Sequence, residues 1–106
     1  MYDDRTPPKI TEFLPEHIEA ALALWRATEH LGLNEVDDQP ANLARFLRRN
    51  EGCSFVALDS DEVVGACLCG HDLRRAAIYH LAVHPAFRRS GLGRELVAAS
   101  LSALSG

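Results

Sequence analysis

The chain has 106 residues, of which 47% are hydrophobic and 25% charged, and its formal net charge is −4. This length allows one domain with a modest core, and the composition is that of an ordinary globular protein. No apolar run approaches the ~18 residues of a membrane helix, and the acidic balance argues against nucleic acid as the main partner.

The first half of the chain predicts one strand followed by two helices. Proline and glutamate at positions 15 and 16 are typical of a first helical turn, and apolar residues then recur at helical spacing. An acidic cluster (Glu35, Asp37 and Asp38) occupies the stretch between the two helical patterns. The expected elements are a strand over 9–14, a helix from 15 to about 30, a loop over 31–40 and a helix over 41–50.

The second half predicts three strands and a final helix. A polar turn at 59–62 separates two strand-like runs and makes a β-hairpin, with Gly65 as the place for a bulge. The expected strands cover 53–58, 63–69 and 76–83, and the helix covers 92–104. The fold class is therefore α+β with layered elements in the order β-α-α-β-β-β-α.

The three cysteines carry no sign of a disulfide framework or a metal site. They are odd in number and lack C-x-x-C spacing, which suits reduced, buried thiols. Cys67, Cys69 and His71 alternate along one strand, but side chains two apart lie ~6.5–7 Å from each other, a poor fit to one tetrahedral ion. We expect no metal. A cytoplasmic location is expected as well, because the acidic N-terminus has no apolar signal region.

The most informative segment joins the third of these strands to the final helix. Pro85 stops an apolar run, and the turn that follows carries Arg88, Arg89, Gly91 and Gly93 before the helix. Backbone N–H groups at a helix N-terminus attract anions, and glycines leave room for a phosphate to approach. Residues 73–106 hold 5 basic and 1 acidic side chains, against 6 basic and 14 acidic in the rest. The pattern predicts a phosphorylated cofactor.

Two common phosphate-binding motifs do not match this turn. A dinucleotide fingerprint needs a glycine three residues after Gly93, where the chain has Leu96. A P-loop needs a lysine beside its last glycine, and the only lysine is Lys9.

The motif R-x-x-G-x-G, after a strand that ends Leu-Ala-Val-His-Pro, resembles the GNAT superfamily of acyl-CoA-dependent N-acetyltransferases. The resemblance implies a GNAT-like mixed sheet, with residues 1–106 as a single domain that forms the N-terminal and central part of the fold. Members of this family usually continue with a further strand, a helix and a pair of strands. We therefore expect this chain to be C-terminally truncated relative to them.

The resemblance also implies a cosubstrate, acetyl-CoA, and a reaction, acetyl transfer to a primary amine of a small molecule or protein. The backbones of Leu81, Ala82 and Val83 would pair with the pantetheine arm. The pyrophosphate would be held by the turn, formed by Arg88, Arg89, Ser90, Gly91, Leu92, Gly93 and Arg94.

The sequence offers two candidates for the proton acceptor. Some family members carry a glutamate on this strand where the chain has Ala77, which leaves His80 and Tyr79 as candidate catalytic residues. Strand alternation predicts that these two side chains lie on opposite faces. A packed strand histidine is the alternative reading of His80. The acidic cluster could attract a cationic amine, with a solvated loop as its alternative.

The expected truncation has consequences for partners. It would leave the strand over 76–83 with an unpaired apolar edge, which favours self-association. We expect a homodimer or completion by another chain. Two alternatives to an acyltransferase stay open: a non-catalytic coenzyme A-binding or regulatory module, and a dimerising remnant without activity.

Overall fold

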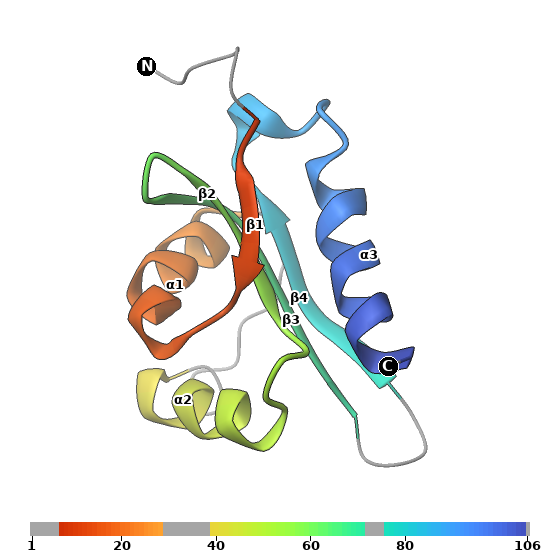
Figure 1. Cartoon of the computed structure of the whole chain (residues 1–106). Helices are drawn as coiled ribbons and strands as arrows, with labels where there is room; N and C mark the ends of the chain where they lie inside the picture. Colours follow the sequence, from red (N-terminus) through yellow and green to blue (C-terminus); the bar gives the residue numbers. More distant parts are fainter. Residues whose placement is uncertain (1–6, 29–38, 72–75, 106) are drawn as a thin grey trace.

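The computed structural model describes residues 7–28, 39–71 and 76–105 (Figure 1). Two short 3₁₀ helices, η1 (Pro15–His17) and η2 (Pro85–Phe87), precede α1 and α3. The remaining elements are β1 (Lys9–Glu12), α1 (Ile18–Ala27), α2 (Pro40–Arg49), β2 (Phe55–Asp59), β3 (Glu62–His71), β4 (Ala76–Val83) and α3 (Leu92–Ser105).

The expected order of elements and the α+β class are confirmed, and the expected bounds of the strand over 76–83 are those observed for β4. The four described strands form one sheet in the order β1-β2-β3-β4. Every described pair is antiparallel, so the mixed character expected of the sheet is not seen in these strands. The expected loop over 31–40 lies mostly outside the described residues.

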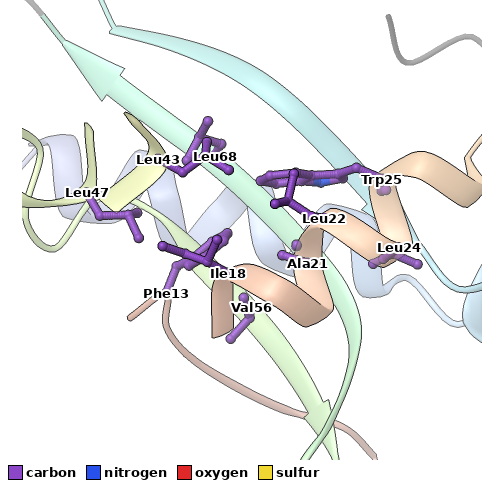
Figure 2. Packing of buried hydrophobic residues seen from close by; sticks show 12 residues of the cluster. Phe13, Ile18, Ala21, Leu22, Leu24, Trp25, Leu43, Leu47, Val56 and Leu68 are labelled. Atoms are coloured by element: carbon purple, nitrogen blue, oxygen red, sulfur yellow. The ribbon is translucent and has the colours of Figure 1, made fainter. Parts of the chain in front are cut away.

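Helices cover both faces of this sheet. Figure 1 shows α1 and α2 on one side and α3 on the other. The larger core lies under α1 and α2, where Leu22 and Trp25 are buried against Val56 and Leu68 of the sheet (Figure 2). Each such buried side chain contributes about 1.5–3 kcal/mol relative to an exposed one. This face therefore supplies much of the stability.

The smaller core lies under α3. Its buried members are Ala57, Val64, Cys67, Phe87, Leu92 and Leu96. Gly65 allows α3 to lie this close, because a Cβ at that position would come within 2.9 Å of the Leu96 Cδ1 atom. The β2–β3 bulge expected at Gly65 falls on its neighbour Val64, since Ala57 pairs with Gly65 and Leu58 with Val63. Gly65 thus serves helix packing.

The predicted hairpin turn is present between β2 and β3. Asp59 pairs with Glu62, and the two residues between them have positive φ angles, 51° at Ser60 and 71° at Asp61. Positive φ at both positions is the type I′ geometry whose twist matches that of paired strands.

A buried serine extends the contact between β2 and β3 beyond the strand ladder. The Ser54 hydroxyl accepts a hydrogen bond from the Cys69 N–H (2.9 Å) and donates one to the Cys69 carbonyl (3.1 Å). A second buried serine, Ser100 of α3, donates to the Cys67 sulfur at 3.6 Å. Sulfur is a weak acceptor, so these two serines should differ in their contribution to stability.

We predict that Ser54→Ala lowers the free energy of unfolding by about 1–3 kcal/mol, because it leaves a buried N–H and a buried C=O of Cys69 without their partner. Ser100→Ala is the matched control and should cost less. Urea unfolding of both variants measures the difference. An equal loss in the two variants would contradict this account of Ser54.

Candidate active site

The turn between β4 and α3 is held by its own hydrogen bonds. His84 closes the first turn of η2, where its Nδ1 accepts from the Ala86 N–H at 3.1 Å. The Ser90 hydroxyl donates to the Phe87 carbonyl at 2.6 Å, and the Phe87 side chain is buried under α3. These contacts place the residues that follow, 88 to 91, at the N-terminus of α3.

The surface of this turn is open at Gly91. Its φ is +83°, and a Cβ built there would have no atom within 4 Å. At Gly93 a Cβ would meet only the Val83 side chain, at an ordinary contact distance of 3.6 Å. The protein's own packing therefore leaves space beside both glycines of the motif.

Unpaired amides and three arginines belong to this turn and to the first residues of α3. The first hydrogen bond of α3 runs from the Glu95 N–H to the Gly91 carbonyl (3.1 Å). The N–H groups of residues 92 to 94 precede that bond and have no acceptor within the helix. Arg88, Arg89 and Arg94 are exposed, whereas Leu92 is buried as the anchor of the helix. Helix dipole and side chains both favour an anion here.

One of these arginines is already engaged. The Arg88 Nε donates a hydrogen bond to the carbonyl oxygen of Val83, the last residue of β4, at 3.0 Å. The sequence predicted Arg88 only as a source of positive charge. Its side chain also connects the turn to the strand.

The backbone of β4 presents alternate residues to its open edge. β4 is the last strand in the described sheet, and the His84 N–H donates to the Val64 carbonyl of β3 at 2.7 Å. Because hydrogen-bonded pairs alternate in an antiparallel ladder, Ala82 also directs its backbone groups toward β3. Leu81 and Val83 direct theirs away from β3.

The expectation that Tyr79 and His80 lie on opposite faces is wrong. Leu68 pairs with His80, but the next residue of β3, Cys69, pairs with Ile78. Tyr79 is therefore the extra residue of a β-bulge, and a bulge interrupts the alternation of side chains. Both side chains lie on the side of the sheet that α1 and α2 cover.

Aromatic contacts show where these two side chains lie. The Tyr79 ring meets Phe46 of α2 edge to face, with centroids 5.6 Å apart, and 56% of Tyr79 is exposed. The His80 ring lies 5.0 Å from that of Trp25 in α1 and is half-buried. Sequence reasoning missed Phe46 and Trp25 as neighbours, because their helical spacing indicates only that they face a core.

The remaining predictions concern the acidic cluster, the cysteines and the membrane. The acidic cluster of Glu35, Asp37 and Asp38 lies outside the described residues. The described residues contain no group of three histidine, cysteine or acidic side chains arranged to hold a metal ion.

Burial raises the pKa of the Cys67 thiol, and the hydrogen bond that Ser100 donates to the Cys67 sulfur lowers it in part. Within residues 7–28, 39–71 and 76–105, no helix is long and apolar enough to span a membrane.

Comparison with known proteins agrees with this geometry. The sequence model of the acetyltransferase (GNAT) family matches residues 16–105. An acetyltransferase from Photorhabdus laumondii is 32% identical over 90 residues, and one from Pectobacterium atrosepticum is 30% identical over 89. The alignments cover 85% and 84% of this chain, which spans only 62% of each relative's length.

A solved structure shows the same fold. The PaiA N-acetyltransferase of Thermoplasma acidophilum, determined in complex with coenzyme A, superposes with a TM-score of 0.79 at 12% identity. The match covers 94% of this chain and 73% of that one. With the family match over residues 16–105, the R-x-x-G-x-G turn and the shared fold, the chain belongs to the GNAT acetyltransferase family.

Proposed function

We propose that this chain binds acetyl-CoA and takes part in transfer of the acetyl group to a primary amine. The observation that carries the proposal is the open turn at Gly91, which combines the unpaired N–H groups at the start of α3 with three exposed arginines, Arg88, Arg89 and Arg94. A pyrophosphate has the charge and the acceptor oxygens that such a site favours. The family match supports acyl transfer in general.

In this proposal the two parts of coenzyme A occupy two parts of the site. The pyrophosphate binds the turn, at the residues Arg88, Arg89, Ser90, Gly91, Leu92, Gly93 and Arg94. The pantetheine arm lies along the open edge of β4, as an added strand would. Leu81 and Val83 supply the backbone groups that face this edge, and Ala82 lies between them with its own groups toward β3.

The chemistry then takes place beside Leu81. The amine nitrogen attacks the thioester carbonyl, a C–N bond forms, the C–S bond breaks, and coenzyme A leaves as the thiolate. A backbone N–H at the β4 edge would stabilise the negative charge on the carbonyl oxygen. The amine must lose a proton, so a base or a water chain must accept it.

The bulge supports His80 and Tyr79 as candidate proton acceptors, because both side chains then lie on one side of β4 within two residues of Leu81 along the strand. His80 is held by its contact with Trp25, whereas Tyr79 is more than half exposed. We propose His80 as the acceptor, since imidazole is the side chain best suited to proton transfer near neutral pH.

A non-catalytic coenzyme A-binding module is the second candidate function. Ala77 stands where some family members carry a glutamate, and both His80 and Tyr79 pack against helix side chains. Binding of acetyl-CoA without turnover of any amine in a broad panel would favour this module. Turnover would exclude it.

The open edge of β4 is also a place where another protein chain can bind. Edge strands offer unpaired N–H and C=O groups to other chains. The exposed large apolar side chains of the described residues include Ile78 and Tyr79 of this strand. We propose that a second copy of the chain, or another chain, pairs with this edge.

We also propose a reducing compartment such as the cytoplasm, because it suits the free thiols of Cys53, Cys67 and Cys69.

Binding of the cosubstrate should depend on Gly91. Gly91→Asp should abolish binding of acetyl-CoA, because it places a side chain and a negative charge where the pyrophosphate is proposed to lie. Gly91→Asn, which adds similar bulk without charge, should weaken binding less. Calorimetric titration measures both.

Gly52→Asn is the matched control for backbone strain. Gly52 has a φ of +82° and, like Gly91, nothing within 4 Å of a built Cβ. It belongs to the connection between α2 and β2, and Figure 1 shows this connection at the opposite end of the sheet from the start of α3. This variant should bind acetyl-CoA as the unaltered chain does. Equal losses at positions 52 and 91, or no binding by the unaltered chain at millimolar acetyl-CoA, would contradict the proposal.

Turnover, and not binding of acetyl-CoA, should depend on the proposed proton acceptor. His80→Gln should lower kcat by roughly 10²-fold, the usual contribution of general base catalysis, and leave the affinity for acetyl-CoA unchanged. Steady-state kinetics and titration separate the two effects. Tyr79→Phe keeps the ring contact with Phe46 and should retain most activity. A larger loss in Tyr79→Phe than in His80→Gln would assign the role to Tyr79.

Pairing at the open edge of β4 should make the chain a dimer. Light scattering of the chain at micromolar concentration should give the mass of a dimer. A stable monomer under these conditions would remove the homodimer and leave only pairing with a different chain.

A further inference from the structure

We propose that Arg88 is a positioning residue that sets the spacing between the pantetheine edge and the pyrophosphate turn. This inference rests on the proposed function, because both parts belong to the proposed acetyl-CoA site. It assigns Arg88 a role that a positive charge alone does not fulfil.

The bond from Arg88 to β4 joins the two parts directly. The Arg88 Nε lies 3.0 Å from the Val83 carbonyl oxygen, which the ladder directs away from β3 and toward the open edge. The backbone of Arg88 is held separately, since its N–H donates to the Pro85 carbonyl at 3.4 Å. Arg88 thus contacts the strand through its side chain and the turn through its backbone.

This bond also changes what the edge of β4 offers to a ligand. The Val83 carbonyl already accepts a hydrogen bond from Arg88, so the unshared groups along this edge are the Val83 N–H and the N–H and C=O of Leu81. A pantetheine amide carbonyl can accept from the Val83 N–H, and a pantetheine N–H finds a better acceptor in the Leu81 carbonyl than in a Val83 carbonyl shared with Arg88. Arg88 therefore favours one register of the arm along the strand.

The fold of the turn has other supports. Ser90 and Phe87 bond to each other, Phe87 is buried under α3, and the Phe87 N–H donates to the His84 carbonyl at 2.8 Å. The Val83 carbonyl lies at an exposed site, where water can replace a lost donor. Loss of the Arg88 side chain should therefore alter the spacing of the site more than the stability of the chain.

The substitution Arg88→Lys distinguishes the positioning role of this side chain from the effect of its positive charge. It retains the positive charge but has no N–H at the Nε position and none of the planar geometry of the guanidinium group. Arg88→Lys should therefore fail to hold the Val83 carbonyl in place, while it preserves the attraction for phosphate.

The test compares whole coenzyme A with 3′-phospho-ADP, which has the pyrophosphate but lacks the pantetheine arm. By calorimetry, Arg88→Lys should bind coenzyme A roughly tenfold more weakly, about the effect of one lost charge-assisted hydrogen bond. Its affinity for 3′-phospho-ADP should stay within about twofold. Arg88→Ala should lose affinity for both ligands. Arg48→Lys, an exposed change on α2, is the control for both titrations.

The outcomes separate the two proposals. Unchanged binding of both ligands by Arg88→Lys, or equal weakening of both, would overturn the positioning role and leave the acetyl-CoA site intact. Absence of coenzyme A binding in the unaltered chain would overturn the proposed function itself. Should Arg88→Lys unfold, NMR of the unaltered chain provides a second test. The Arg88 Nε should show a scalar coupling across the hydrogen bond to the Val83 carbonyl carbon, and its absence would contradict the bond.

Discussion

Strand β3 is buried on both faces, and the positions of the other elements depend on that burial. Residues 64 to 70 are all buried, and small side chains let the helices approach. A Cβ at Gly65 would lie 2.9 Å from Leu96 of α3, and one at Gly70 would lie 2.6 Å from Phe46 of α2. Close packing at two glycines therefore fixes both helix layers against one strand.

Each of these close approaches places part of the site. Contact of α3 with Gly65 brings the N-terminus of that helix next to the end of β4, since β3 and β4 are paired there through Gly65 and Val83. Contact of α2 with Gly70 brings Phe46 to the ring of Tyr79 at the bulge. The proposed anion-binding turn and the aromatic side of β4 are thus positioned by the same buried strand.

The proposed site consists mainly of backbone groups in fixed directions, and few of its side chains have fixed hydrogen-bond partners. Amides at the start of α3 and backbone groups along β4 keep their directions because helix and ladder hold them, and the Arg88 bond joins the two sets. Backbone donors of this kind lose little freedom when a ligand binds, which favours a cofactor site. By contrast, the side of β4 that carries Tyr79 and His80 depends on ring contacts with two different helices.

The sequence alone determined the order of elements, the bounds of β4 and the open turn, because these follow from local signals: alternation, proline, glycine and helical spacing. It also indicated the family through the R-x-x-G-x-G motif. The bulge at Tyr79 was decided by the pairing of β4 with β3, which alternation within one strand cannot reveal. The partners of Arg88, Tyr79 and His80 are likewise contacts between segments, so only the tertiary structure brought them together.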